Sequence, residues 1–438
     1  MRSRLPPPFA ALLIGIAITA PLPALSQAWP HPHTTNTDEA KVGTYVLPDP
    51  LVSSAGTPVT TPREWRTRRL EILALAQDNQ FGRTPTAPIR PRFEVWERDA
   101  VGLGGLSRRS QIRIRFSDRP DDPVLHVLLH VPANTKRPPP VIVSLGFEPN
   151  IMTVPEPGVE EGFGWDLRTH QRVTGSKATV IGHLDVAALV RRGYAVASIY
   201  YGDIEPDFAG GDAFSVRRLF PMANPRGPHD WGAIGAWAWG ASRVLDYLLK
   251  DPEVDARRAA ILGASRLGKA ALWTGAQDER FAAVIPVISG EGGATLSRRD
   301  FGETIADSTA PGKGYPYWFA PHYADLAADP RTLPLDSHML LALVAPRPLL
   351  LVNGSSDTWS DPTGEWLAAR AATPVYRLLG REGVPAERPP LGQIAGRQLA
   401  VVTHDGPHGL LPQDVERIAD FLDAELPAQA KITSGRGP

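Results

Sequence analysis

Apolar residues in this chain are grouped into short runs that predict a sheet. Residues 111–116 (QIRIRF) alternate polar and apolar positions, which is typical of a strand with one covered face. Residues 124–132 and 139–147 are nearly unbroken apolar runs, as expected for strands that are covered on both faces. The pattern therefore predicts three early strands, of which the second and third are buried on both faces.

Strands and helices then alternate to the end of the chain. Residues 258–290 predict a strand, a turn, a helix and a second strand in direct succession. This alternation indicates an α/β fold with a mostly parallel central sheet flanked by helices, a three-layer sandwich, in which the leading strands are antiparallel. The other predicted segments are a helix at 62–82, a helix and strand at 186–207, an apolar helix at 230–250, single strands within 346–357 and 395–409, and a closing amphipathic helix at 412–426.

The N-terminal end of the chain has the pattern of a targeting signal. Two early arginines and an apolar run at 9–25, broken by prolines, predict a signal peptide over residues 1–26, with a small-residue cleavage site at Ala24-Leu25-Ser26 or one step later at Ser26-Gln27-Ala28. An uncleaved membrane anchor is the alternative, which the shortness of the run disfavours. We therefore expect a periplasmic or secreted protein that does not bind membranes after removal of the signal.

One catalytic domain is predicted between two irregular ends. Residues 27–60 are rich in Pro, Thr and His and predict a poorly ordered lead-in, and residues 428–438 predict a flexible tail. Residues 61–427 are expected to form the single catalytic domain, of the α/β-hydrolase type. Within it, the stretches at 150–180 and 308–336 are too long for plain connections and predict insertions above the sheet.

Composition excludes several classes of function. The chain has 46 basic and 47 acidic residues, so its formal net charge of −1 gives no indication of a nucleic-acid partner. It has no cysteine, which excludes disulfides and a thiol nucleophile. The histidines at 31 and 33 do not predict a metal site, since a stable site needs three or four converging ligands. No metal and no organic cofactor is implied.

The segment GASRLGKAAL, residues 263–272, is the first candidate for chemistry. A short apolar strand precedes it and a helix pattern follows it, which is the layout of a nucleophile elbow around Ser265. The usual elbow is Gly-x-Ser-x-Gly, but here Leu267 stands where the second glycine is expected and Gly268 comes one residue later. An ordinary glycine-containing turn between strand and helix is the alternative.

Two further polar residues also follow predicted strands. Asp357 comes after LLLVNGSS and His408 after LAVVTHDGP, so serine, acid and histidine occur in the chain order of the α/β-hydrolase fold. In such a triad the histidine takes the proton of the serine and the acid stabilises the imidazolium. His404 competes with His408, but the longer loop favours His408 as the base.

These motifs resemble a known family. GASRLGKAALWTGA, together with GEGGATLSRRDFGETI, DTWSDPTGEW and HDGPHG, is similar to the bacterial glucuronoyl esterases of carbohydrate esterase family 15, over about residues 120–425. In that family too the second glycine of the elbow comes one place late, and its usual cysteine before the serine is Ala264 here.

The resemblance implies roles for single residues. Ser265 matches the nucleophile, and Arg266 matches the arginine whose side chain and backbone N–H are thought to stabilise the oxyanion. Lys269, one helical turn after Ser265, matches a lysine that binds sugar hydroxyls. Glu303 and Trp359 match residues that contact the sugar.

The catalytic acid is the position at which the family varies. Fungal members carry it as a Glu just before a Ser-Gly, where this chain has Ile288, and Glu291 follows three residues later. Bacterial relatives often have an Asp after the next strand, which matches Asp357. Asp357 is therefore the expected acid and Glu291 the reserve.

The resemblance predicts a monomeric, secreted carbohydrate esterase. It is expected to hydrolyse esters of (4-O-methyl-)glucuronic acid in glucuronoxylan or in lignin–carbohydrate linkages, through an acyl-enzyme. One alternative is the same machinery acting on acetylxylan or another carboxylic ester. An alternative of another class is a catalytically silent carbohydrate-binding homologue of such hydrolases.

Overall fold

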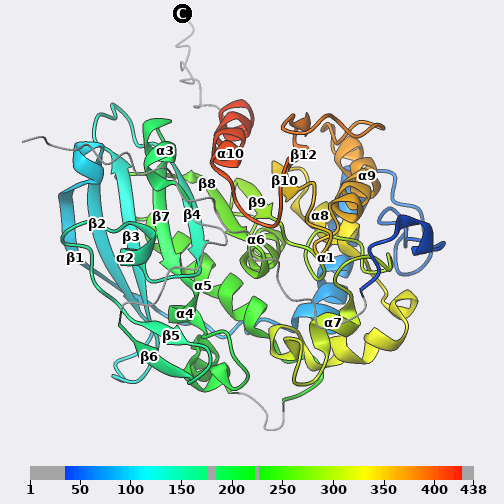
Figure 1. Cartoon of the computed structure of the whole chain (residues 1–438), viewed down its shortest axis with the longest axis horizontal. Helices are drawn as coiled ribbons and strands as arrows, with labels where there is room; N and C mark the ends of the chain where they lie inside the picture. Colours follow the sequence, from blue (N-terminus) through cyan, green and yellow to red (C-terminus); the bar gives the residue numbers. More distant parts are fainter. Residues whose placement is uncertain (1–34, 175–183, 222–225, 427–438) are drawn as a thin grey trace, which may run out of the picture. The chain divides into compact units, whose positions relative to one another are not determined.

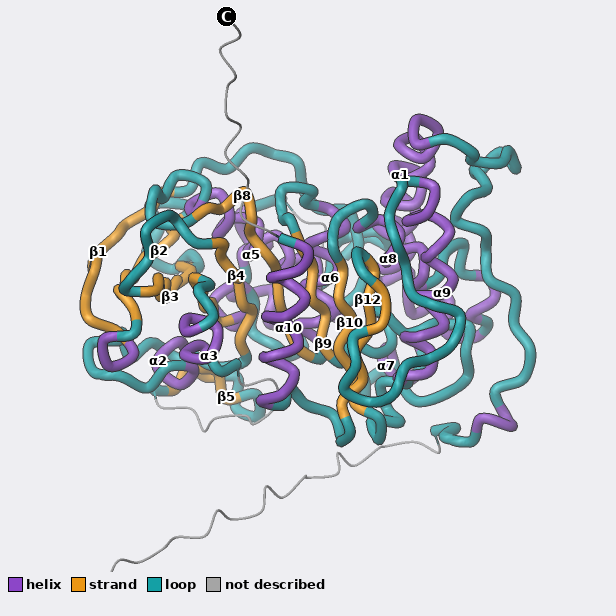
Figure 2. Tube along the Cα trace, turned by 90° about the horizontal axis from the view of Figure 1, so that it is seen from above, coloured by secondary structure: helices purple, strands orange, loops and turns teal. Residues whose placement is uncertain are grey.

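The computed structural model describes residues 35–174, 184–221 and 226–426, and these residues contain a mixed ten-stranded sheet with helices on both faces (Figures 1 and 2). The signal peptide predicted at 1–26, the first part of the lead-in and the tail at 428–438 lie outside the described residues. The strands, in spatial order, are β1 (Arg92–Gly102), β2 (Ser107–Arg115), β3 (Val124–Pro132), β7 (Ala195–Tyr200), β4 (Pro140–Gly146), β8 (Asp255–Ala264), β9 (Ala283–Val287), β10 (Leu349–Gly354), β12 (Leu399–His404) and β11 (Ala395–Gly396).

The sheet has an antiparallel and a parallel part, as the sequence predicted. β1, β2 and β3 pair antiparallel, and β3 pairs antiparallel with β7. From β7 to β12 the neighbouring strands are parallel, with register pairs such as Val143 with Ile261 and Val352 with Val402. The carboxyl ends of the parallel strands therefore meet at one edge of the sheet, where ligands of open α/β sheets bind.

Helices cover both faces of this sheet. Residues of α1, α5, α6, α8 and α9 pack in one hydrophobic cluster, and residues of α3 and α10 pack in the other. The helices are α1 (Pro62–Ala76), α2 (Asn150–Thr153), α3 (Val186–Arg191), α4 (Tyr201–Ile204), α5 (Ala233–Leu248), α6 (Arg266–Gln277), α7 (Ile305–Thr309), α8 (Ser337–Val344), α9 (Pro362–Leu378) and α10 (Pro412–Glu425).

The apolar runs of the sequence explain this arrangement. Val141 and Val143 of β4 belong to the first cluster, whereas Ile142 between them belongs to the second. Because successive side chains of a strand point to opposite faces, a strand covered on both faces has to be apolar at every position. The layers and the sheet are those of the α/β-hydrolase fold, which confirms the predicted fold class.

The structure differs from the sequence prediction at the edges of the molecule. β1 was not predicted, because it is an edge strand whose residues are mostly exposed and therefore carry no apolar run. The insertion at 150–180 contains a short hairpin of β5 (Gly164–Asp166) and β6 (Gln171–Val173). Figure 1 shows this hairpin at the same end of the strands as α4, which follows β7 directly.

Part of the predicted lead-in follows a defined path along the domain. Glu39 forms an ion pair with Arg299, and the Pro48 carbonyl accepts a hydrogen bond from His338 at 2.8 Å. Tyr45 packs against the first hydrophobic cluster. Residues 35–60 are therefore bound to the domain, a feature that their polar, proline-rich composition does not reveal.

No helix among the described residues is both long enough and apolar enough to cross a bilayer.

Candidate active site

Ser265 occupies a strained turn between β8 and α6. Its backbone angles are φ 55° and ψ −127°, a region that residues with a side chain rarely adopt. Backbone hydrogen bonds hold it there: its N–H donates to the Val287 carbonyl at 2.9 Å, and its own carbonyl accepts from the N–H groups of Gly268 at 2.8 Å and Lys269 at 3.1 Å. This is the geometry of a nucleophile elbow, in which the serine is raised above the end of the sheet.

The two glycines around Ser265 are required by close contacts. A Cβ atom at Gly263 would lie 2.2 Å from the Leu267 carbonyl oxygen, and one at Gly268 would lie 2.7 Å from the Val287 carbonyl oxygen. Position 268 is where the first turn of α6 crosses the end of β9, so the late glycine is needed at that position. The unusual spacing of the motif is thus a consequence of how α6 packs on the sheet.

Asp357 and His408 lie directly against each other. The Oδ2 atom of Asp357, which follows β10, is 2.6 Å from Nδ1 of His408, in the loop after β12. The Ser360 hydroxyl lies 3.1 Å from the same ring nitrogen, and the Ser360 N–H donates to Asp357 Oδ1 at 3.2 Å. Burial alone would raise the pKa of Asp357, but the hydrogen bond and positive charge of His408 hold that pKa below its ordinary value.

His404, the competing histidine, has partners of its own. It is buried, its Nδ1 atom lies 2.9 Å from Asp414 Oδ2, and its Nε2 atom lies 3.0 Å from the Pro407 carbonyl oxygen. Both ring nitrogens therefore face groups of the loop after β12 and of the start of α10. This arrangement favours a structural role for His404.

Glu291, the reserve acid, lies in a different environment from Asp357. Its Oε1 atom accepts hydrogen bonds from Tyr323 at 2.5 Å and from Ser297 at 3.0 Å. Burial raises the pKa of Glu291 to about 8, so the side chain is mostly protonated and uncharged at neutral pH. A neutral acid is a poor partner for an imidazolium, which favours Asp357 over Glu291.

Arg266 is held by a carboxylate and by aromatic rings. Its Nη1 atom forms an ion pair with Asp207, and its guanidinium lies 5.1 Å from the ring centre of Trp318 and 5.6 Å from that of Phe147. Burial disfavours the charged form, but the Asp207 carboxylate raises the pKa of Arg266 above its ordinary value. Its buried Nε has no hydrogen-bond partner within the described residues.

Asp207 is the site residue that the sequence did not reveal. The side chain is buried and accepts hydrogen bonds from Trp318 Nε1 at 2.6 Å and from the Tyr317 hydroxyl at 2.9 Å, in addition to Arg266. The only available signal was its place a few residues after the predicted strand YAVASIYY, which ends at Tyr201. Its partners come from the insertion at 308–336 and from α6, so only tertiary packing brings them together.

Lys269 and Glu303 form a buried ion pair behind the elbow. Lys269 Nζ lies 3.3 Å from Glu303 Oε2 and donates to the Ser289 carbonyl at 2.8 Å. Glu303 also accepts from the Ser308 hydroxyl at 2.9 Å, and its N–H donates to the Trp359 carbonyl at 2.8 Å. An ammonium group has three N–H donors, and these contacts within the described residues use two of them. The three residues predicted to bind the substrate are therefore joined in one network.

The described residues contain no group of three or more His, Asp or Glu side chains that could hold a metal ion.

Known proteins resemble this chain over most of its length. The family model for glucuronyl esterases of fungi matches residues 221–380. The carbohydrate esterase MZ0003, from an unknown prokaryotic organism, is 36% identical over 415 residues, which are 91% of this chain and 94% of that relative. The solved glucuronoyl esterase from Solibacter usitatus is 41% identical, with a TM-score of 0.83, and the match covers 88% of this chain and all of that one. The 4-O-methyl-glucuronoyl methylesterase 1 of Phanerochaete chrysosporium is 28% identical over 76% of this chain and 62% of that relative.

The fold and the comparisons together define a carboxylic ester hydrolase of the α/β-hydrolase fold. The chain belongs to the glucuronoyl esterases of carbohydrate esterase family 15, as its motifs predicted.

Proposed function

We propose that this protein is a secreted esterase that hydrolyses esters of glucuronic or 4-O-methyl-glucuronic acid, as they occur in lignin–xylan linkages. The observation that carries the proposal is the strained Ser265 elbow at the same sheet edge as the paired Asp357 and His408. The names of the relatives as glucuronoyl esterases and methylesterases support the acid side of the ester. The apolar run near the N-terminus supports export.

The reaction follows from the roles of these three residues. Ser265 Oγ attacks the ester carbonyl while His408 Nε2 takes its proton, and Asp357 stabilises the imidazolium through Nδ1. Collapse of the tetrahedral intermediate breaks the bond to the alcohol, which leaves with the proton from His408. Water then attacks the acyl-enzyme, again with His408 as the base, and releases glucuronic acid and free Ser265.

Arg266 supplies positive charge where the oxyanion forms. The Arg266 N–H is at the first position of α6 and has no acceptor within the helix, so it can donate to the same oxygen. The side chain is already held by Asp207 and the surrounding rings, so little reorganisation is needed during the reaction. Lys269, Glu303 and Trp359 then serve to bind the sugar on the acid side of the ester.

A comparison of substrates tests this proposal. We expect kcat/KM of the wild-type protein for benzyl glucuronate to exceed that for acetylated xylan and for a simple aryl acetate. Acetate esters hydrolysed better than the glucuronate ester would establish the alternative, an acetylxylan or general carboxylic ester hydrolase. A protein that hydrolyses none of them, and that a serine-directed fluorophosphonate does not label, would be the silent carbohydrate-binding homologue.

Lys269→Met should lower activity selectively on the glucuronate ester. We expect a loss of about 1–3 kcal/mol of transition-state stabilisation for that ester, because sugar hydroxyls lose a buried donor. An aryl acetate has no sugar to hold, so its kcat/KM should change by less than about twofold. The two esters are measured with each variant.

A control is needed because Lys269→Met leaves Glu303 buried without its cation, which is destabilising. The double variant Lys269→Met/Glu303→Gln removes both charges and should recover thermal stability without recovering glucuronate activity. Equal losses on both esters in both variants would assign Lys269 to support of the elbow and would remove the basis for sugar binding.

Asp207→Asn should reduce kcat through Arg266. An amide holds the guanidinium less firmly, so we expect a loss of about 10–100-fold in kcat on both esters, with little change in KM. In an Arg266→Met background the same change should cost less than about threefold, because the two residues act together.

Tyr317→Phe is the matched control for Asp207. It removes one hydrogen bond to Asp207 but leaves the ion pair with Arg266, so kcat should stay within about threefold of the wild type. If Asp207→Asn costs as much with Arg266→Met as without it, Asp207 serves the fold alone.

A further inference from the structure

A large groove lies beside the candidate active site, at the same edge of the sheet. It has a volume of about 1090 Å³ and is lined by β2, β3, the β5–β6 hairpin and the segment around Phe214. The start of β3 pairs antiparallel with the end of β7, with Val127 opposite Ile199. The groove therefore opens at the carboxyl ends of the parallel strands, where Ser265 also lies. None of the residues assigned to catalysis or sugar binding above lines it.

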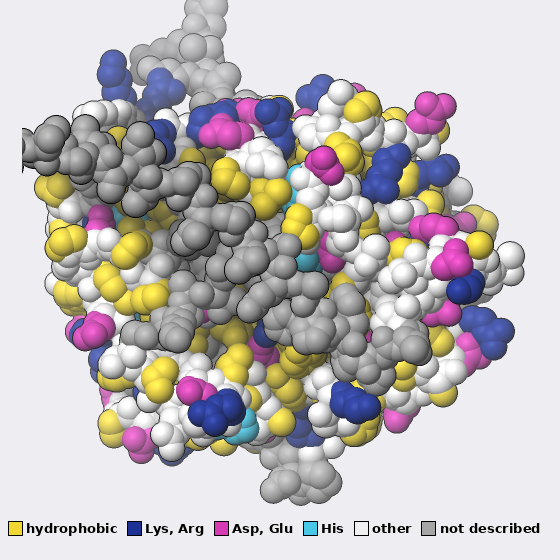
Figure 3. Space-filling view, viewed as in Figure 1, with side chains coloured by type: hydrophobic (Ala, Val, Ile, Leu, Met, Phe, Trp, Pro, Cys, Tyr) yellow, Lys and Arg dark blue, Asp and Glu magenta, His cyan; other side chains and the backbone are white. Residues whose placement is uncertain are grey.

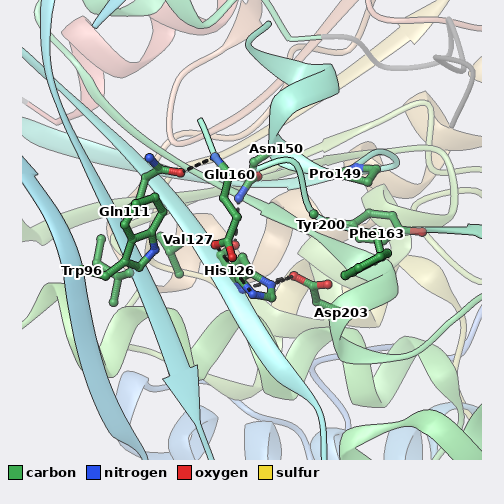
Figure 4. Close-up of a pocket in the computed structure, with 12 residues that line it drawn as sticks. Trp96, Gln111, His126, Val127, Pro149, Asn150, Glu160, Phe163, Tyr200 and Asp203 are labelled. Carbon is green, nitrogen blue, oxygen red and sulfur yellow. Dashed lines mark hydrogen bonds and ion pairs between the residues drawn. The ribbon is translucent and has the colours of Figure 1, made fainter. Parts of the chain in front are cut away.

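Hydrogen-bonding side chains line one part of the groove. His126 Nδ1 lies 2.8 Å from Asp203 Oδ2, and the other ring nitrogen lies 3.9 Å from Glu160, which is beyond hydrogen-bond distance. Figure 4 shows these three side chains pointing toward one another beside Phe163. Because Asp203 fixes Nδ1, the Nε2 atom of His126 remains free to bind a hydroxyl group of a ligand.

The arginines that line the groove are balanced by carboxylates, and several of these groups are paired with one another. Arg113 lies 2.6 Å from Glu160, and Arg218 lies 4.0 Å from Asp122. His126 has Asp203 as its counter-charge. The groove therefore offers polar atoms without a large excess of either sign, which suits a neutral polar ligand better than an anion.

Aromatic rings are exposed on the wall of the groove. Phe163 is 55% exposed and Phe214 is 43% exposed, which is unusual for side chains of this size. Phe214 packs against Trp165, with ring centres 4.9 Å apart, and this contact helps to hold the Phe214 ring in place. Figure 3 shows that hydrophobic side chains gather over β1–β3 and over the β5–β6 hairpin on this face.

We propose that this groove is an accessory binding site for a neutral chain of pyranose sugars. The flat apolar faces of such rings stack on aromatic side chains, and their hydroxyl groups pair with the donors and acceptors that line the groove. The volume is that of a site for a ligand of several rings. The inference deepens the proposed function, on which it rests, because it assigns a place to the polysaccharide chain that carries the ester.

The position of the groove suits a chain that continues into the active site. β3 is separated from β8, which ends directly before Ser265, by β7 and β4, so the axes of the two strands are about 14 Å apart. The ring of His170, in the groove, stacks on Phe208 with centres 4.0 Å apart, and Phe208 follows Asp207 directly. A sugar chain bound here would leave its esterified glucuronate within reach of the elbow.

The test combines binding and kinetics on the full-length protein. Calorimetry measures the binding of linear xylohexaose to Ser265→Ala, and to the same variant with Phe214→Ala or Phe163→Ala added. We expect each aromatic change to weaken binding by about tenfold. In the active protein the same changes should raise KM for polymeric glucuronoxylan ester and leave kcat/KM for methyl glucuronate unchanged.

Leu249→Ala is the matched control. Leu249 is 45% exposed, close to the value for Phe214, but it lies at the end of α5, outside the groove. Xylohexaose binding that is equal in Phe214→Ala, Phe163→Ala and Leu249→Ala would overturn the inference, as would tighter binding of an oligogalacturonate than of xylohexaose. Failure of the wild type to hydrolyse methyl glucuronate would instead overturn the proposed function, since the binding measurement does not depend on turnover.

Discussion

Ser265→Ala will abolish ester hydrolysis and leave the protein folded. The change removes one oxygen atom, the nucleophile, so no acyl-enzyme can form. We expect kcat to fall on the order of 10⁶-fold, with the remaining activity due to the oxyanion site and to substrate binding. Alanine does not relieve the positive φ of the elbow, and the hydrogen bonds that hold the turn are made by the backbone. The melting temperature should therefore stay close to that of the wild type.

Two measurements check this result. The first is kcat for benzyl glucuronate, and the second is covalent labelling by a serine-directed fluorophosphonate, which should be lost with Ser265→Ala. Ser356→Ala is the control, since Ser356 is an exposed serine in the loop after β10, and it should retain both activity and labelling. Activity of Ser265→Ala within tenfold of the wild type would show that another group is the nucleophile.

Asp357→Asn will have the second largest effect, while Glu291→Gln will have a small one. An amide at position 357 keeps the size of the side chain but cannot stabilise the imidazolium of His408, and it can hold the ring in the wrong tautomer. Loss of a triad carboxylate in this way lowers kcat by about 10⁴-fold. The affected step is proton transfer, so the loss should appear in kcat on every ester.

The two carboxyl groups differ because their environments differ. Asp357 is buried but ionised, held by His408 and Ser360, whereas Glu291 has a pKa of about 8 and is mostly neutral at pH 7. Replacing a neutral acid by a neutral amide changes little charge, so we expect Glu291→Gln to retain kcat within about tenfold. Kinetics of both variants at pH 7 decide the matter: a larger loss for Glu291→Gln would place the catalytic acid after β9.

Much of the fold could be predicted from apolar patterns. Strands β3, β4, β8 and β9 lie within segments that the sequence marks as apolar, and the antiparallel lead and parallel remainder of the sheet were both expected. β1 and the β5–β6 hairpin could not be predicted in the same way. The residues of β1 are mostly exposed, and β5 is only three residues long. An edge strand such as β1 is held by pairing with its neighbour, and this pairing requires no apolar pattern in the sequence.

The candidate site likewise contains some residues that the sequence predicts and others that it does not. The family motifs name Ser265, Arg266, Lys269, Glu303, Asp357 and His408, because each lies in a recognisable string of residues. The sequence does not reveal Asp207, because its partners lie 59 and 111 residues away at Arg266 and Trp318. The groove of His126 and Phe214 is likewise assembled from strands, a hairpin and a loop that share no local pattern.

The sequence by itself therefore determined the class of fold, the family and the chain order of the candidate reactive residues. These are local properties: an apolar face requires burial, and a nucleophile elbow requires glycine where the backbones come close. Only the tertiary structure decided which carboxylate pairs with His408, which one remains neutral, and what holds Arg266 in place. The physical reason is that pKa and orientation depend on burial and on partners across the sheet, and these exist only once distant segments have packed together.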